Sequence, residues 1–131
     1  MIRKSLFCAL ACLFFAVPAT AAGDDVRVCS LTRAYECNIN GECSEWTIEQ
    51  MALPRFVRID LKKNSIISLD KAVKRNDTKI AQVQHLEGVT ILQGVEDRGW
   101  TIALGQESGS LTAVASGEGH GFIVFGFCIN P

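Results

Sequence analysis

The stretch Gly121-Phe122-Ile123-Val124-Phe125-Gly126-Phe127-Cys128 decides the fold, because every one of its positions is apolar or glycine. A run of this length and composition is typical of a β-strand that is buried on both faces. We therefore expect residues 121–128 to form the strand around which the rest of the chain packs. Its last residue, Cys128, can join this strand to another part of the chain through a disulfide.

Alternation of apolar and polar residues predicts further strands along the chain. The clearest alternation runs over 56–62, with three aliphatic residues on one face and three charged residues on the other. The remaining expected strands are 26–31, 46–51, 66–69, 78–85, 89–92, 100–104 and 111–115. Residues 68–75 form either one or two helical turns or an exposed loop. Turn signals recur about every 10 residues, which predicts a single all-β antiparallel domain of about eight strands, either a sandwich or a small barrel.

Residues 1–22 have the composition of a secretory signal peptide. Two basic residues precede an apolar run, and small residues then permit cleavage near Ala21 or Ala22. The apolar run is shorter than the roughly 20 residues that a membrane-spanning helix needs. A lipoprotein signal requires a cysteine at the cleavage point, whereas Cys12 lies inside the apolar run. We expect residues 23–131 to form one exported β-domain, periplasmic or secreted.

Removal of residues 1–22 takes away two of the six cysteines and two of the 13 basic residues, so the formal net charge changes from −1 to −3. Neither charge favours a nucleic-acid-binding protein. No later segment is apolar for long enough to cross a bilayer as a helix, so we do not expect an integral membrane protein.

The four remaining cysteines are expected to form disulfides, because the chain is small and exported. Four cysteines allow three pairings, of which we favour Cys37 with Cys43 and Cys29 with Cys128. Asn40-Gly41 lies between the first two, and this turn pair brings its flanking residues opposite one another in a hairpin. The second disulfide would join the first expected strand to the last.

The residues favour neither a metal nor a cofactor, and we predict none. The cysteines lack the Cys-x-x-Cys spacing and the nearby histidine of a zinc site. Residues 36–41 (ECNING) partly resemble the start of a calcium loop, but the twelfth position is Thr47 and no helices flank it, so we prefer a plain Asn-Gly turn. Residues 117–121 contain Gly-x-Gly-x-Gly, but a strand follows where a phosphate-binding loop needs a helix.

We also predict no catalytic residues. Only His85 and His120 remain after export, and the chain has neither Gly-x-Ser-x-Gly nor His-Glu-x-x-His. The carboxylates that a glycosidase requires are scattered over different turns. We expect His85 to be a half-buried packing residue and His120 an exposed turn residue.

The turn Glu96-Asp97-Arg98-Gly99-Trp100 carries the most varied chemistry in the chain. The Arg98 guanidinium can lie over the Trp100 indole, and both can face a ligand. We therefore choose Arg98, Trp100 and His120 as candidate ligand contacts. Trp100 begins an expected strand, and burial in the core is the alternative that we favour for it.

Residues 55–79 hold eight basic and three acidic residues, a net charge of +5. Such a surface can attract an anionic glycan, a lipid headgroup or an acidic protein. The simpler interpretation, which we favour, is that the lysines and arginines protect an edge strand and solvate a loop.

Four segments carry a family resemblance: 53–60 (LPRFVRID), Gln93-Gly94, 98–100 (RGW) and 121–128 (GFIVFGFC). In these segments the chain resembles a family of small exported proteins of proteobacteria whose activity is uncharacterised. The resemblance covers most of residues 23–131 and implies a periplasmic or secreted location. It implies no catalytic or binding residue.

The function that we expect is that of a non-enzymatic binding module, which recognises a periplasmic or cell-surface protein or an anionic glycan through its loops and basic stretch. The alternative is an inhibitor of a secreted or cell-wall hydrolase, because small exported β-barrels with disulfides include lysozyme inhibitors. An enzyme ranks third, because no acid, base and nucleophile could be combined into a site.

Overall fold

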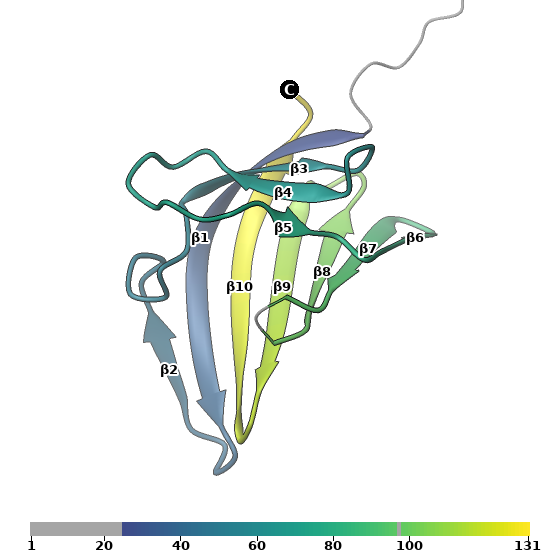
Figure 1. Ribbon diagram of the computed structural model, residues 1–131. Coiled ribbons are helices and arrows are strands. Elements are labelled where there is room, and N and C mark those ends of the chain that lie inside the picture. Colours follow the sequence, from purple (N-terminus) through teal and green to yellow (C-terminus); the bar gives the residue numbers. More distant parts are fainter. Residues whose placement is uncertain (1–24, 97) are drawn as a thin grey trace, which may run out of the picture.

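The computed structural model describes residues 25–96 and 98–131, which form ten β-strands and no helix (Figure 1). The strands are β1 (Val26–Asn38), β2 (Cys43–Trp46), β3 (Phe56–Asp60), β4 (Ser65–Ser68), β5 (Thr78–Lys79), β6 (Gln82–Leu86), β7 (Val89–Gly94), β8 (Trp100–Gly105), β9 (Ser110–Gly117) and β10 (His120–Ile129). The all-β antiparallel fold that the sequence predicts is thus confirmed. The predicted signal peptide, residues 1–22, lies outside the described residues.

All the strands belong to one antiparallel sheet, which curls into a half-barrel (Figure 1). Their order across the sheet is β5-β4-β3-β1-β10-β9-β8-β7-β6. The long strand β1 pairs with β10 along one side, and with both β3 and β2 along the other. Of the two architectures expected, the molecule therefore takes the barrel-like one, with a single curved layer in place of two packed sheets.

The two edge strands, β5 and β6, follow one another in the sequence and are linked by Ile80 and Ala81. The Ile80 N–H donates to the Asn64 carbonyl in the turn between β3 and β4, and the Ala81 N–H donates to the Gln93 carbonyl in β7, both at 2.8 Å. This link bridges the two sides of the half-barrel and places Ile80 in the core, where it is 2% exposed.

Residues on the concave face of the sheet form register rows across five neighbouring strands. The first row is Thr90, Leu104, Leu111, Gly126 and Leu31. The second row is Leu92, Ile102, Ala113, Val124 and Ala34. The third row is Gly94, Trp100, Ala115, Phe122 and Glu36. We call the part of the interior beside the first row the packed half, and the part beside the third row the open half.

The packed half contains the main hydrophobic core. Its buried members are Cys29, Val57, Ile59, Ile80, Leu92, Ile102, Leu104, Leu111 and Cys128. They come from six strands and from the link between β5 and β6, so the core joins both sides of the half-barrel. A smaller cluster of Ala34, Ile48 and Val124 lies toward the open half.

The structure corrects the prediction that the closing strand is buried on both faces. On β10 the concave face holds Val124 and Cys128, which are buried, whereas Phe125, Phe127 and Ile129 on the convex face are 40%, 63% and 66% exposed. The physical reason is that an antiparallel sheet needs cover on only one side. Here the curled sheet covers its own concave face, and nothing among the described residues covers the convex one.

Both disulfides have the pairing that the cysteine spacing predicts. Cys29 of β1 is bonded to Cys128 of β10, its register partner, and the two are 99 residues apart in sequence. Cys37 is bonded to Cys43 across the hairpin of β1 and β2, six residues away. Disulfides persist in oxidising surroundings, so they indicate an extracellular or periplasmic compartment.

Several expected element boundaries differ from the structure. The first strand continues past residue 31 to Asn38, and the expected strand 46–51 is replaced by β2 and a turn over 47–52. Of the segment 68–75, Ser68 ends β4 and residues 69–75 form a loop, one of the two forms expected for the segment. No helix in the described part of the chain has the length and apolar character to cross a membrane.

Candidate functional site

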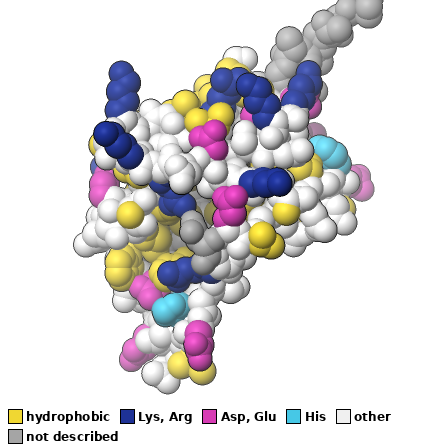
Figure 2. All heavy atoms as spheres, viewed as in Figure 1, with side chains coloured by type: hydrophobic (Ala, Val, Ile, Leu, Met, Phe, Trp, Pro, Cys, Tyr) yellow, Lys and Arg dark blue, Asp and Glu magenta, His cyan; other side chains and the backbone are white. Residues whose placement is uncertain are grey.

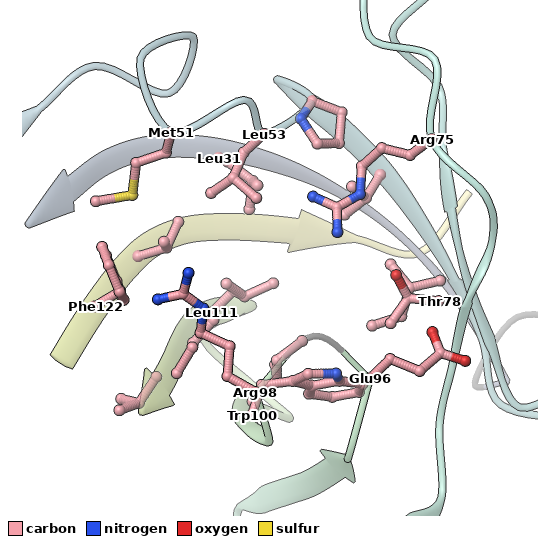
Figure 3. A pocket seen from close by; sticks show the side chains of 18 of the residues that line it. Leu31, Met51, Leu53, Arg75, Thr78, Glu96, Arg98, Trp100, Leu111 and Phe122 are labelled. Carbon is pink, nitrogen blue, oxygen red and sulfur yellow. The ribbon is translucent and has the colours of Figure 1, made fainter. Parts of the chain in front are cut away.

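The open half of the interior contains a cavity of about 670 Å³. This volume lies within the range of small-molecule sites in proteins, roughly 300–1,000 Å³. Most of its wall is apolar, and Figure 3 shows side chains such as Leu31, Met51 and Trp100 converging on it from different elements. In Figure 2 apolar side chains are visible in the hollow between the upper part, where lysines and arginines gather, and the tapering lower end.

Small side chains on β9 leave room for this cavity. The concave residues of β9 change from Leu111 in the first row to Ala113 and Ala115 in the second and third. Leu111 is 2% exposed and belongs to the main core, although it also borders the cavity, whereas Ala113 and Ala115 line the cavity with much smaller side chains. The concave side chains of β9 are therefore large at one end of the strand and small at the other.

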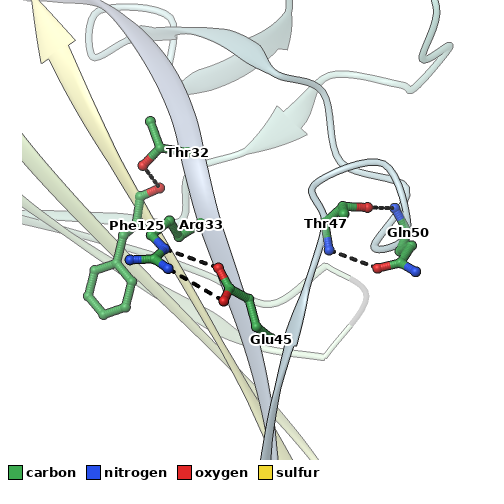
Figure 4. Close-up of polar contacts among 6 residues, drawn as sticks. All are labelled: Thr32, Arg33, Glu45, Thr47, Gln50 and Phe125. Atoms are coloured by element: carbon green, nitrogen blue, oxygen red, sulfur yellow. Dashed lines mark hydrogen bonds and ion pairs between the residues drawn. The ribbon is translucent and has the colours of Figure 1, made fainter.

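The turn over residues 47–52 forms one wall of the cavity. The Thr47 N–H donates to Gln50 Oε1 at 2.9 Å, and the Gln50 N–H donates to Thr47 Oγ1 at 3.1 Å, a reciprocal pair like a capping box (Figure 4). Ala52 has a φ of 53°, and the Leu53 N–H donates to the Ile48 carbonyl, which ends the turn. Met51 and Leu53 are thereby held against the cavity.

A β-bulge in β1 decides which of its residues face the cavity. The register with β10 shifts between Leu31 and Arg33, and the intervening Thr32 donates its hydroxyl to the Phe125 carbonyl at 3.2 Å (Figure 4). An inserted residue reverses the alternation of the strand. Leu31 is therefore followed on the concave face by Ala34 and Glu36, while Arg33 turns outward and pairs with Glu45 at 3.0 Å.

The Trp100 indole lies directly against Gly94, its register partner on β7. A Cβ atom at Gly94 would lie 2.2 Å from Cζ2 of the indole, so only glycine permits this packing. Trp100 is half-buried and lines the cavity, a position between the core burial and the ligand contact that the sequence offered as alternatives. Its Nε1 is inaccessible to solvent and has no hydrogen-bond partner among the described residues.

Arg98 also lines the cavity, but its partner is not the one expected. The guanidinium lies over the ring of Phe122, 4.9 Å from the centroid, and not over the Trp100 indole. Sequence reasoning missed Phe122, because it belongs to the closing strand and was assigned to the core. Asp97, next to Arg98 in the same turn, lies outside the described residues.

His120 lies beside this arginine–aromatic pair. Its ring makes an edge contact with Phe122, with 5.3 Å between centroids, and its Nδ1 is 3.6 Å from Glu36 Oε1. Glu36 and Phe122 line the cavity, so all three candidate contacts chosen from the sequence lie in or next to one site. His85 lies apart from it, exposed rather than half-buried as expected, with Nδ1 3.2 Å from Thr90 Oγ1.

Much of the basic stretch 55–79 is occupied by ion pairs and turns. Arg55 pairs with Glu49, Lys62 pairs with Asp25 at 3.4 Å, and Arg58 is 3.9 Å from Asp60. Asp60 is buried, and its Oδ1 accepts the N–H groups of residues 62 and 63, which holds the turn after β3. Of the basic residues in this stretch, Arg75 lines the cavity.

The loop that carries Arg75 is anchored by Asp70. Its carboxylate accepts hydrogen bonds from the backbone N–H groups of Ala72, at 3.0 Å, and Arg55, at 3.2 Å. These two bonds lower the pKa of Asp70, because they favour its charged form.

Among the described residues, no group of three or more His, Cys, Asp or Glu side chains is arranged to hold a metal ion. The chain matches no family model, and comparisons with curated proteins and with solved structures likewise give no match.

Proposed function

We propose that this protein is a non-enzymatic binding module that holds a small, mainly apolar ligand in the cavity of its half-barrel. The observation that carries the proposal is the cavity itself, about 670 Å³ of largely apolar interior left open by alanines on β9. The cavity is partly open to solvent, so its apolar wall contacts water unless a ligand covers it, and covering apolar surface is favourable. We further propose export to the periplasm or the exterior, with removal of residues 1–22.

The test is the binding of an uncharged fluorescent probe, Nile red, to the oxidised protein. The two tryptophans of the chain, Trp46 and Trp100, both line the cavity, so energy transfer from them reports a probe bound there. We expect saturable binding with one probe per chain. Ala113→Phe fills the cavity and is expected to abolish the signal.

The matched control is Ala103→Phe. Ala103 neighbours Ala113 through Ile102 and Thr112 but points to the convex face, so the substitution adds the same volume outside the cavity. Thermal melting checks that both variants fold. No saturable binding by the unmodified protein, or equal binding by the folded Ala113→Phe variant, would contradict the proposal.

A second candidate function, inhibition of a secreted or cell-wall hydrolase, is favoured by the hairpin tip at residues 38–42. Ile39 is 84% exposed there, on a loop closed by the Cys37–Cys43 disulfide and by hydrogen bonds of the Asn38 Oδ1 with two backbone N–H groups. A rigid loop with an apolar tip is suited to insertion into a cleft. Here Ile39→Asp should abolish inhibition of cell-wall hydrolysis and leave Nile red binding unchanged.

A further inference from the structure

We infer that the ligand of the cavity is an amphiphile with an anionic head group, which Arg98 binds at the edge of the cavity. This inference rests on the proposed function and adds the class of ligand to it. The apolar part would lie along the second and third rows, where Ile102, Val124 and Trp100 form the wall.

Arg98 is positioned for such a contact by its own turn and by Phe122. The Arg98 N–H donates to the Glu96 carbonyl at 2.8 Å, and Gly99 follows with a φ of +69°. The guanidinium carbon lies over the Phe122 ring, 4.9 Å from its centroid. A cation–π contact with a ring uses none of the N–H donors, so they stay available for an oxyanion.

The two carboxylates that line the cavity, Glu36 and Glu96, have contacts of their own. Glu36 lies next to His120, and Glu96 Oε2 accepts the Lys79 N–H at 3.1 Å. No carboxylate of the described residues forms an ion pair with Arg98, whereas Arg33 and Arg55 each have one. Arg98 therefore lies over an aromatic ring at an apolar cavity, and no carboxylate of the described residues neutralises its charge by an ion pair.

The cavity wall carries charges of both signs. Arg75 also lines the cavity, from the loop between β4 and β5, and in Figure 3 its side chain and that of Arg98 both point toward the interior from different elements. Glu36 and Glu96 line the cavity as well, so the preference for an anionic head rests on Arg98, which forms no ion pair with a described carboxylate. Near low-dielectric walls a charge attracts its opposite more strongly than it does in water.

The experiment is displacement of Nile red by four ligands that share a ten-carbon chain: decanoate, decyl phosphate, decanol and decyltrimethylammonium. We expect the two anions to displace the probe at concentrations about tenfold lower than decanol does, the contribution of one charge-assisted contact. The cation should be the weakest. Comparing decanoate with decyl phosphate tells whether the head is a carboxylate or a phosphate. Each added methylene should tighten binding about fourfold until the cavity is full.

Arg98→Gln should remove the preference for anions and leave the affinity for decanol unchanged, while Arg98→Lys should keep most of the preference. Lys63→Gln is the control, because it removes the same charge from the exposed turn after β3. Equal displacement by decanol and the anions, or a preference that survives in Arg98→Gln, would overturn the inference and leave the proposed function standing. Failure of Nile red to bind would contradict both.

Discussion

The packed half and the open half of the interior are built on the same strands but are filled differently. In the packed half, large side chains such as Leu92, Leu104 and Leu111 are at most 4% exposed and belong to one buried cluster with the disulfide between β1 and β10. In the open half the corresponding positions of β7 and β9 carry Gly94 and Ala115, and a cavity remains.

Under the proposed function, stability depends mainly on the first row of the sheet and ligand binding on the third. Backbone pairing is continuous from one half to the other, so the difference between the halves lies in their side chains and not in the pairing of the strands. Substitutions in the two halves should therefore have separable effects, on stability in the packed half and on binding in the open half.

The largest expected effect is the loss of the disulfide in the packed half. Replacing Cys29 and Cys128 together by serine frees a loop of about 100 residues in the unfolded chain, which costs up to about 4.7 kcal/mol in the chain-entropy model, whereas the Cys37–Cys43 pair contributes about 2 kcal/mol. Calorimetry should show a fall in melting temperature of well over 10 °C for the first pair and about half as much for the second. Comparable losses would mean that loop length does not set the difference.

Truncation of core side chains should give the next largest contrast. Leu92→Ala removes a side chain that is completely buried in the packed half, and we expect it to cost roughly 2–5 kcal/mol. Leu53→Ala removes a half-buried side chain at the cavity wall and should cost about 1 kcal/mol, because little new void is created. Urea unfolding with unchanged m-values measures both. If Leu53→Ala costs as much as Leu92→Ala, the two halves are equally packed.

A smaller effect is expected on the convex face of the same central strand. Phe127 is 63% exposed, so Phe127→Ser should change the free energy of unfolding by no more than about 0.5 kcal/mol. Val124 is buried on the concave face of the same strand, and Val124→Ser serves as the comparison. A large loss of stability for Phe127→Ser would show that this face is covered in solution.

The smallest effect concerns Asp70, which ties the loop of Arg75 to the sheet. Because its pKa is lower in the folded protein than in the unfolded chain, the stabilisation is present at neutral pH and is lost as the pH falls through the folded pKa. Asp70→Asn should therefore lose a small amount of stability at neutral pH and none in acid. Asp77→Asn is the control, since that carboxylate accepts no hydrogen bond from the described residues. Urea titrations at several pH values would refute this if the two variants behaved alike.

The strands were predictable because alternation and turn residues are local signals. Residues 100–104 and 111–115 alternate cleanly and are strands, and the spacing of the cysteines gave both disulfides. The error on β10 has a physical origin. An apolar composition is compatible with burial of both faces of a strand. Whether a second layer of structure covers the other face depends on the tertiary arrangement.

The candidate site was predictable only in part. Arg98 and Trp100 were chosen because a guanidinium and an indole in one turn are good ligand contacts, and the structure places both at the cavity. Glu36 was not found, because the face to which its side chain points depends on the bulge at Thr32. No residue type in that stretch indicates a bulge. Phe122 was not recognised as a site residue, because it lies within an apolar run that predicts a core strand. Both residues reach the site through non-local pairing, which a single sequence does not reveal.

The central place of β10 has a consequence for the order in which the molecule assembles. β10 lies between β1 and β9, so the strands β1 to β5 and the strands β6 to β9 form one continuous sheet only when residues 120–129 are present. The ribosome makes these residues after all the others in the sheet, and pairing of distant segments is slow in any case. Until then β1 and β9 each lack the strand that pairs with them in the finished sheet. A chain that crosses a membrane before folding would gain from this delay, because the complete sheet cannot form before residues 120–129 have been made.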